Sequence, residues 1–370
     1  MSQDQRLAVE LGARSYEIVV GGGLLGRAGG EIAHVLRRPD AVVITDGNVA
    51  GTPHLRALER SLGAAGIAHR AIVLPPGEAT KSMAQLVELL DRLLDLGIDR
   101  ATTIVALGGG VLGDLAGFAA AIALRGIDYV QVPTTLLAQV DSAIGGKTGI
   151  NTRQGKNLVG AFHQPRLVLA DVAVLGTLPP RELRAGYAEV VKYALIDRPD
   201  FFAWLEACGR EVLAGDPAAQ QYAVVESCRA KAAVVAADER EGGVRALLNL
   251  GHTFAHALET ACGYGDELLH GEAVALGLVL AFDLSVRLGL CPPADADRVR
   301  AHLDAVGLPT RLGAIRSGGF ALDALLAPMA RDKKAEGGRP RFVLTRGIGR
   351  AFAGVEVDPA QLEPLLEAAA

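Results

Sequence analysis

Short apolar runs that end in polar or glycine-rich turns recur through the first half of the chain. Tyr16, Ile18 and Val20 alternate with polar or small neighbours, which is typical of a half-buried β-strand. β-branched runs follow at residues 41–45, 71–74, 102–107 and 129–133, and helical patterns such as residues 81–96 separate several of them. Repeated units of strand, turn and helix predict an α/β sheet. Ligands on such sheets bind at the carboxyl ends of the strands, where the sequence has Asp46, Glu78, Gly108 to Gly110 and Thr134.

The pattern changes after Leu178-Pro179-Pro180. Residues 181–195 have helical periodicity, and helical patterns dominate up to about residue 329. Strand patterns return at residues 341–345 and 350–357, where we expect a small hairpin, and Asp358-Pro359 is suited to begin a final helix. We therefore predict two domains: an α/β domain with a Rossmann-like sheet over residues 1–180, and a mainly α-helical domain over residues 181–370.

Composition and charge narrow the functions that the chain can have. Its 370 residues suit two domains, and its net charge of −5 argues against nucleic acid as the main partner. The longest clean apolar run, residues 273–282, is too short to cross a bilayer, and residues 1–10 do not resemble a signal peptide. Cys208, Cys228, Cys262 and Cys291 form no C-x-x-C pair, so we expect reduced, buried thiols in a cytoplasmic protein.

A glycine-rich turn is the first candidate ligand site. Residues 108–113 fit the pattern G-x-G-x-x-G, follow a predicted strand and precede a helical run. Backbone amides at such a turn can approach a pyrophosphate, and the helix N-terminus favours its negative charge. Asp128 lies roughly where a ribose-binding acid is expected, while Asp114 either faces the nicotinamide or simply stabilises the start of the helix. The alternative is a glycine-rich turn without a ligand.

Two lysines and an asparagine form the second candidate site. Residues 140–151 are loop-like in composition and contain Lys147, and Gly155-Lys156-Asn157 follows closely. Lysine supplies charge, asparagine a directed N–H group, and glycine exposed backbone amides, so these loops suit a phosphate. The Gly-Gly-Lys-Thr run is not a P-loop, because position 141 is Asp where that motif requires Gly. A solvated surface loop is the alternative.

Histidines on helical patterns form the third candidate site. His252 and His256 are four residues apart, which puts both imidazoles on one helix face. His270 begins the next apolar helix, and Glu189 is a carboxylate among apolar residues that needs a partner. Such side chains could hold a divalent metal ion with a position left for substrate, or they could satisfy helix packing. The spacing alone does not choose between His252 and His256.

Long stretches of the chain resemble one enzyme family. They include PPGEATKS, LGGGVLGDLAGFAAAIALRGIDYVQVPTTLLAQVDSAIGGKTGIN, GKNLVGAFHQP, TLPPRELRAGYAEVVKYALI, DEREGGVRALLNLGHTFAHALE, LLHGEAVALG and RDKKAEGG, in this order. These motifs are similar to those of the 3-dehydroquinate synthases, and the resemblance covers nearly the whole chain. It implies an α/β NAD-binding domain followed by a helical metal- and substrate-binding domain.

The resemblance also implies a reaction. The substrate is a phosphorylated keto acid, 3-deoxy-D-arabino-heptulosonate 7-phosphate, and the products are 3-dehydroquinate and phosphate in the shikimate pathway. NAD⁺ transiently oxidises the substrate, phosphate leaves by β-elimination, the ketone is reduced again, and an intramolecular aldol reaction closes the ring. The implied cofactors are NAD and one divalent metal ion, Zn²⁺ or Co²⁺, and the implied assembly is a homodimer.

Site residues follow from the same resemblance. Metal ligands are implied at Glu189, His252 and His270. NAD contacts are implied for Asp46, Asn48, Glu78, Lys81, Gly110, Asp114, Thr134, Thr135, Asp141, Lys156, Thr177 and Leu178. Catalytic roles are implied for Lys147, Lys192, Arg245, Asn249 and His256. These five are also expected to bind substrate, together with Asp141, Asn157, Lys231, Lys334 and, from a neighbouring subunit, Arg125.

Three alternatives share parts of this pattern. Sister sugar phosphate cyclases share the fold, NAD and the metal, but several act on substrates without the carboxylate that Arg245 and Lys231 suit. An iron-dependent alcohol dehydrogenase would release NADH, and we would not expect the loop with two lysines in it. A non-catalytic homologue would normally lose a metal ligand or the phosphate lysine, and this sequence retains all of them.

Overall fold

The chain folds into two compact units. The computed structural model describes residues 3–317, 319–330 and 341–369. The first unit consists of Met1–Pro179 and Gly215–Arg240, and the second of Pro180–Ala214 and Glu241–Ala370. A single boundary near residue 180 therefore misses the return of the chain to the first unit. The returning segment is helix α8 (Pro217–Ala237), which packs against strands of the first unit, a contact that its sequence does not reveal.

A seven-stranded sheet forms the centre of the first unit, as far as the structure describes it. The strand order is β1-β2-β9-β6-β5-β3-β4, with β1 antiparallel to β2 and all other neighbours parallel. The α/β expectation and the strands expected from the apolar runs are confirmed. The strands are β1 (Gln5–Val9), β2 (Tyr16–Gly21), β3 (Asp40–Asp46), β4 (Ala68–Leu74), β5 (Thr103–Gly108), β6 (Tyr129–Pro133) and β9 (Leu167–Asp171).

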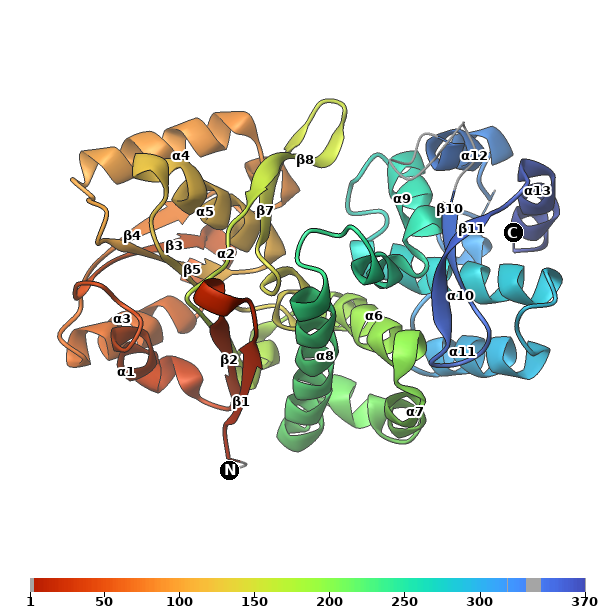
Figure 1. Cartoon of the computed structure of the whole chain (residues 1–370), viewed down its shortest axis with the longest axis horizontal. Coiled ribbons are helices and arrows are strands. Elements are labelled where there is room, and N and C mark those ends of the chain that lie inside the picture. Colours follow the sequence, from red (N-terminus) through yellow and green to blue (C-terminus); the bar gives the residue numbers. More distant parts are fainter. Residues whose placement is uncertain (1–2, 318, 331–340, 370) are drawn as a thin grey trace. The chain divides into compact units, whose positions relative to one another are not determined.

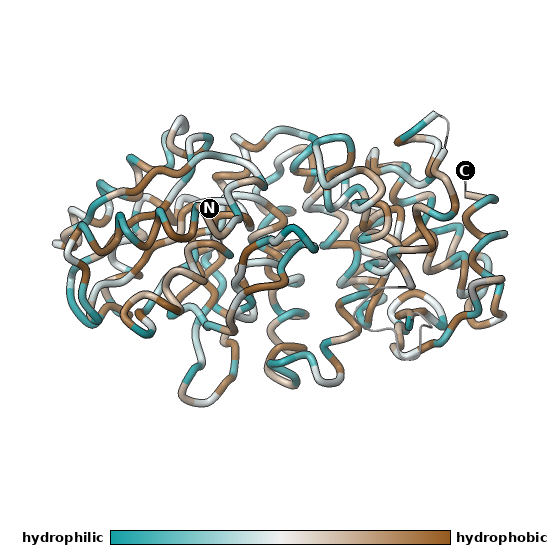
Figure 2. Tube along the Cα trace, turned by 90° about the horizontal axis from the view of Figure 1, so that it is seen from above, coloured by the Kyte–Doolittle hydropathy of each residue, from teal (hydrophilic) through white to brown (hydrophobic). Residues whose placement is uncertain are grey.

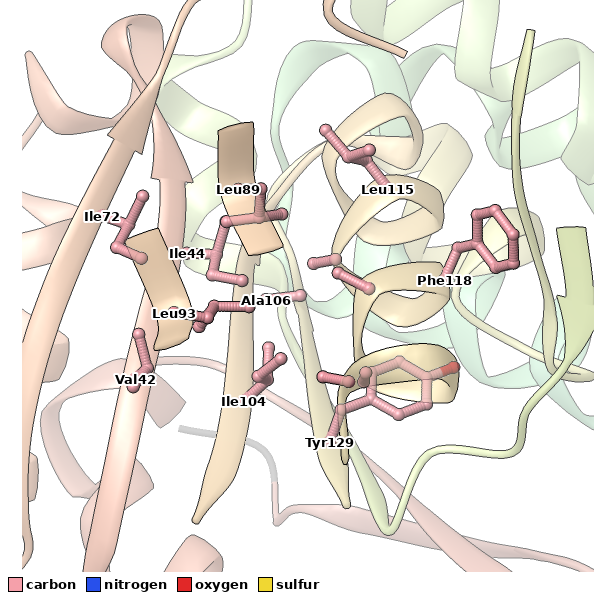
Figure 3. Packing of buried hydrophobic residues seen from close by; sticks show 14 of the residues in the cluster. Val42, Ile44, Ile72, Leu89, Leu93, Ile104, Ala106, Leu115, Phe118 and Tyr129 are labelled. Carbon is pink, nitrogen blue, oxygen red and sulfur yellow. The ribbon is translucent and has the colours of Figure 1, made fainter. Parts of the chain in front are cut away.

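Helices cover both faces of this sheet (Figure 1), and the alternation of side chains along each strand supplies two cores. Val42 and Ile44 of β3 pack with α4 (Met83–Asp95) and α5 (Gly110–Ile122), as Figure 3 shows. Val43, on the opposite face, belongs to the core that includes residues of α1 (Ala28–Ala33) and α3 (His54–Ala64). Because both faces are buried, apolar residues of the central strands point to both faces instead of alternating with polar ones.

The loop expected over residues 140–151, with the glycine-flanked run at residues 155–157, is largely a π-helical turn and a hairpin in the structure. A π-helical turn, η5 (Ala138–Ser142), precedes a hairpin of β7 (Lys147–Thr152) and β8 (Gly155–Phe162). The sequence pattern did not predict these strands, because β8 is mostly exposed and its glycines and polar residues give no alternation of apolar and polar positions. The hairpin carries the lysines and the asparagine of the second candidate site.

The second unit is mainly helical, as expected. Helix α10 (His270–Arg287) is largely buried, and residues 273–282 have no exposed side chain. The small hairpin and the final helix after Asp358 are confirmed, and the Asp358 carboxylate accepts a hydrogen bond from the Ala360 N–H. The other elements are α6 (Pro180–Asp197), α7 (Pro199–Ala214), α9 (His252–Ala261), α11 (Pro293–Ala305), α12 (Leu322–Ala330), β10 (Arg341–Thr345), β11 (Ala351–Glu356) and α13 (Pro359–Ala368).

Many helices are amphipathic (Figure 2), and the four cysteines differ in burial. Hydrophilic and hydrophobic residues alternate along many helices in Figure 2, as expected where one helix face is buried. In the part of the chain that the structure describes, no helix combines the length and apolar character needed to cross a membrane. The four cysteines are free thiols as expected, but only Cys228 and Cys291 are buried, while Cys208 and Cys262 are partly exposed.

Candidate active site

The glycine-rich turn joins β5 to α5 at the carboxyl edge of the sheet. β5 ends at Gly108, and α5 begins at Gly110. A Cβ atom on Gly110 would lie 2.7 Å from the Ser142 hydroxyl oxygen, so the neighbouring turn η5 leaves no room for a side chain. The turn therefore has the strand–turn–helix context that a dinucleotide pyrophosphate requires.

The other residues expected to contact NAD surround this edge within the first unit. Asp46 ends β3, and its carboxylate accepts a hydrogen bond from the Val49 N–H, which caps the short helix α2 (Gly47–Ala50) containing Asn48. Glu78 begins the turn η3 (Glu78–Thr80) after β4. Four others follow β6 or lie at the end of the turn η6 (Val172–Thr177): Thr134, Thr135, Thr177 and Leu178.

A buried ion pair ties two of these loops together. Lys81 is 5 % exposed, and its ammonium pairs with the Asp114 carboxylate on α5. Burial raises the pKa of Asp114 although the adjacent Lys81 opposes this effect. Asp114 thus does more than stabilise a helix start, because it fixes the turn after β4 against the helix after β5.

Asp128 is not a ribose ligand. It lies just before β6, and its backbone carbonyl accepts a hydrogen bond from the N–H of Ile104, at the start of β5. Gly108 is at the other end of β5, so Asp128 is at the amino edge of the sheet. Its carboxylate pairs there with Arg37, with an Nε–Oδ2 distance of 2.7 Å. The expectation that Asp128 binds the ribose is wrong, because its distance from Gly108 in the sequence does not bring it to the carboxyl edge of the sheet.

The three residues of the second candidate site divide between the two strands of the hairpin. Lys147 begins β7, while Lys156 and Asn157 lie on β8. Elsewhere in the first unit, the ammonium of buried Lys231 on α8 pairs with the Asp141 carboxylate and donates to the Asp141 carbonyl oxygen at 2.6 Å. Arg125 is exposed and has a left-handed backbone with φ of 69°, directly after Leu124 with φ of 51°.

Three helices of the second unit bring the expected metal ligands together. Glu189 of α6 is fully buried, and His252 and His270 are the first residues of α9 and α10. Both histidine Nε2 atoms lie 3.5 Å from Glu189 Oε1, and the ligand atoms of the three residues are all within 4.8 Å of one another. Ligand atoms of a tetrahedral zinc site are about 3.4 Å apart, so the cluster fits such an ion.

The groups around the cluster set the tautomer and the protonation of its two histidines. His252 Nδ1 is 3.2 Å from the Leu250 carbonyl oxygen, which favours a proton on Nδ1 and leaves the Nε2 lone pair available. Burial and the Lys192 ammonium lower the pKa of His252 to about 3, so its imidazole is neutral. Burial opposes a charge on His270, yet the carboxylates of Glu189 and Glu259 raise its pKa to about 10. The two carboxylates therefore favour a positive charge beside His270, while His252 stays neutral.

Most of the other candidate site residues of the second unit are close in sequence to the three ligands. Lys192, 1 % exposed, forms an ion pair with Glu189 one helical turn away. His256 lies one turn beyond His252, with ring centroids 5.5 Å apart, but it is not part of the ligand group. Arg245 is buried in the turn η7 (Val244–Asn249), and the Asn249 amide donates to Glu241. Lys334 lies outside the described residues.

Sequence reasoning overlooked three residues that support these sites. Glu259 Oε1 lies 3.4 Å from His270 Nδ1, and its position seven residues after His252 on one helix face could have indicated it. His54 Nε2 lies 2.8 Å from the hydroxyl oxygen of Thr177, an expected NAD contact, and no local pattern marks it. Asn151 joins the hairpin to the turn after β4, and only the tertiary structure reveals this.

Close helix packing sets the position of His270 and gives a testable prediction. A Cβ atom on Gly271 would lie 1.8 Å from the Ala185 carbonyl oxygen of α6. The substitution Gly271→Ala should therefore push the start of α10 away from α6. We expect a loss of at least about 2 kcal/mol of stability and weaker metal binding, measured by thermal unfolding and metal titration. Gly265→Ala, whose Cβ would be 3.9 Å from its nearest neighbour, is the control and should change neither property.

Comparison with known sequences identifies the family. The family description "3-dehydroquinate synthase N-terminal" matches residues 71–185, and "3-dehydroquinate synthase C-terminal" matches residues 186–335. The 3-dehydroquinate synthase of Rhodospirillum rubrum is 64% identical over 99% of this chain and 95% of its own length. The enzyme of the same name from Cereibacter sphaeroides is 58% identical over 97% of this chain and 96% of its own.

Solved structures with the same fold are sugar phosphate cyclases and dehydrogenases. The 2-epi-5-epi-valiolone synthase of Streptomyces hygroscopicus, solved with NAD⁺ and Zn²⁺, has a TM-score of 0.86 and 31% identity, covering 95% of this chain and 96% of that one. A 2-deoxy-scyllo-inosose synthase, solved with carbaglucose-6-phosphate, NAD⁺ and Co²⁺, has a TM-score of 0.86 and 26% identity, covering 99% of this chain and all of that one. Glycerol dehydrogenase of Schizosaccharomyces pombe, with 20% identity, a TM-score of 0.68 and coverage of 95% and 88%, shares the fold alone. With both family regions matched and relatives of the same name nearly collinear with it, the chain belongs to the 3-dehydroquinate synthase family.

Proposed function

We propose that this chain is a 3-dehydroquinate synthase, a carbon–oxygen lyase that converts 3-deoxy-D-arabino-heptulosonate 7-phosphate to 3-dehydroquinate and phosphate. The observation that carries the proposal is the buried cluster of Glu189, His252 and His270, with Lys192 paired to its carboxylate. It occurs in a chain that is 64% identical to a relative of that name. A structural role alone would not require three metal-ligand side chains from separate helices to meet in one buried cluster.

The cluster and the carboxyl edge of the sheet suit the two cofactors. Glu189, His252 and His270 would hold a divalent ion, Zn²⁺ or Co²⁺, and the turn at Gly110 with the loops around it would hold NAD. When bound, the ion supplies Lewis acidity that lowers the pKa of a substrate hydroxyl, and NAD supplies reversible hydride acceptance. Both functions suit a substrate hydroxyl that is oxidised only transiently.

The side chains of the chain itself would bind and orient the substrate. The buried Arg245 guanidinium offers paired N–H groups to a carboxylate, and Lys192 and Lys231 add positive charge in dry surroundings. Lys147 and Asn157 on the hairpin would meet the phosphate and stabilise its dianion as it leaves, while Lys156 on the same hairpin would contact NAD. His256 is assigned to the phosphate by family resemblance. Lys334 is part of the same proposal by family resemblance.

The cellular setting and the assembly are part of the proposal. We infer a cytoplasmic homodimer that acts on a small phosphorylated keto acid and has no nucleic-acid or membrane partner. Arg125 is exposed and ends a tight turn, which suits a residue that extends to the phosphate of a neighbouring subunit. Sedimentation of the purified chain measures its assembly directly.

A phosphate-release assay tests the proposed reaction. We expect the metal-loaded chain to release phosphate from the heptulosonate phosphate with catalytic NAD⁺ and without net formation of NADH, because the substrate is reduced again in each cycle. Net NADH would instead indicate an alcohol dehydrogenase. Release only from a heptulose 7-phosphate that lacks the carboxylate would assign the chain to a sister cyclase.

A further inference from the structure

Asn151 makes three hydrogen bonds that connect two loops of the first unit. Its side-chain amide donates to Glu78 Oε1 at 2.6 Å, and its backbone N–H donates to the Lys81 carbonyl oxygen at 2.8 Å. Its side-chain carbonyl accepts a hydrogen bond from the Asn157 N–H at 3.0 Å. Because the side chain both donates and accepts, an aspartate, alanine or leucine cannot reproduce the arrangement.

The pairing of the hairpin explains why these bonds are available. Ile150 pairs with Val159 and Thr152 with Gly155, so the register shifts at Asn151. On β8 the shift leaves a bulge at residues 156–158 that contains Lys156 and Asn157. A bulge re-aims side chains but weakens the ladder locally. Here, Asn151 supplies the missing ladder contact to the bulge.

The bulge includes a backbone conformation that needs support. Asn157 has φ of 56°, in the left-handed region that few residues other than glycine adopt and that Asn adopts more readily than most. Its N–H is the group that Asn151 Oδ1 accepts. On the other side of Asn151, Glu78 and Lys81 belong to the turn that the Lys81–Asp114 ion pair fixes against α5. The side-chain amide of Asn151 thus links the conformation of the turn at Glu78 to that of the bulge at Asn157.

We propose that Asn151 is a positioning residue that couples occupancy of the NAD site to occupancy of the phosphate site. This inference rests on the proposed function, which assigns Glu78, Lys81 and Lys156 to the cofactor and Asn157 to the phosphate. Bound NAD orders the turn of Glu78, and Asn151 then holds Asn157 in its bound conformation before phosphate arrives. By reciprocity, bound phosphate strengthens NAD binding by the same factor.

Calorimetric titration of the full chain with NAD⁺, in the presence and absence of inorganic phosphate, measures this coupling. In the unsubstituted chain we expect saturating phosphate to strengthen NAD⁺ binding about fivefold or more. In Asn151→Ala the factor should fall to about one, while thermal unfolding shows that the variant is folded. Gln154→Ala is the matched control at the tip of the same hairpin: this side chain is exposed, and the substitution should leave the factor unchanged.

A double substitution that exchanges the donor and the acceptor of the Asn151–Glu78 hydrogen bond separates loss of coupling from a general loss of structure. Asn151→Asp keeps the acceptor for Asn157 but sets its carboxylate against that of Glu78, so we expect the coupling to be lost. Adding Glu78→Gln to Asn151→Asp reverses donor and acceptor and should restore the coupling. Glu78→Gln can weaken NAD⁺ binding by itself, but the coupling factor is a ratio within one variant, so that loss cancels.

The outcomes separate this inference from the proposed function. A coupling factor of one in the unsubstituted chain overturns the inference, and so does an unchanged factor in Asn151→Ala or Asn151→Asp. If Asn151→Ala does not fold, the single and double aspartate variants decide. These titrations use no turnover, so failure of the chain to release phosphate from the heptulosonate phosphate would reject the proposed function without affecting the coupling measurement.

Discussion

The substitution His270→Ala is expected to remove the bound metal ion and to lower the rate of phosphate release about a thousandfold, while NAD⁺ binding is retained. His270 Nε2 lies 3.5 Å from Glu189 Oε1 in the second unit, whereas the residues expected to contact NAD lie in the first. Losing one of three ligands leaves too few donors for a stable site. Metal content by atomic emission, phosphate release and NAD⁺ titration measure the three effects.

Two further variants sharpen this test. Glu259→Gln removes the carboxylate 3.4 Å from His270 Nδ1, and we expect metal affinity to fall about 10- to 100-fold with the ligands intact. His256→Ala should retain the metal and lose affinity for phosphate, which decides between the two histidines that share a helix face. Full metal occupancy in His270→Ala, or loss of metal in His256→Ala, would contradict the assigned ligand set.

The substitution Lys192→Met is expected to have the second largest effect, and it should separate substrate binding from metal binding. Lys192 is 1 % exposed and pairs with Glu189, which is fully buried. Removing Lys192 leaves the buried Glu189 charge balanced by His270 alone, so the metal-free variant should lose up to about 3 kcal/mol of stability. The divalent ion should recover much of this loss, because it neutralises the same carboxylate. Denaturant unfolding with and without metal measures both values.

Activity gives an independent measure of the same residue. Because Lys192 is expected to contact the substrate, kcat/KM for phosphate release should fall about a hundredfold even when the metal is saturating. The matched variant combines Lys192→Met with Glu189→Gln, which removes both charges. It should recover metal-free stability but not activity. A single Lys192→Met variant with normal stability and normal kcat/KM would exclude both roles.

The local pattern predicted the fold where burial imposes a periodicity, and it failed where burial does not. Parallel strands such as β3 and β5 are buried on both faces, so their apolar runs were sufficient to identify them. The strands of the hairpin were not identified, because β8 is largely exposed and interrupted by a bulge. The packing of α8 in the first unit is invisible to local patterns, because a helix carries no mark of the sheet that it will cover.

The candidate residues were likewise predictable in kind but not in arrangement. Residues 108–113 and the histidine pair indicated a dinucleotide and a metal ion, and the family resemblance assigned His270 as the third ligand. The apparent ribose acid, Asp128, was wrong because sequence distance does not tell at which edge of the sheet a residue lies. Glu259 and Asn151 act through other residues, and such support depends on contacts between distant segments.

By itself, the sequence determined the α/β and helical halves, the ligand types and the family, because periodicity, residue chemistry and motif order are local properties. Residue spacing left His252 and His256 open and the family resemblance implied His252 with His270, but only the tertiary structure shows that these two meet Glu189. Their meeting depends on close helix packing. A Cβ atom on Gly277 would lie 2.1 Å from the Gly251 carbonyl oxygen, so α9 and α10 can approach closely enough for their first residues to share one carboxylate.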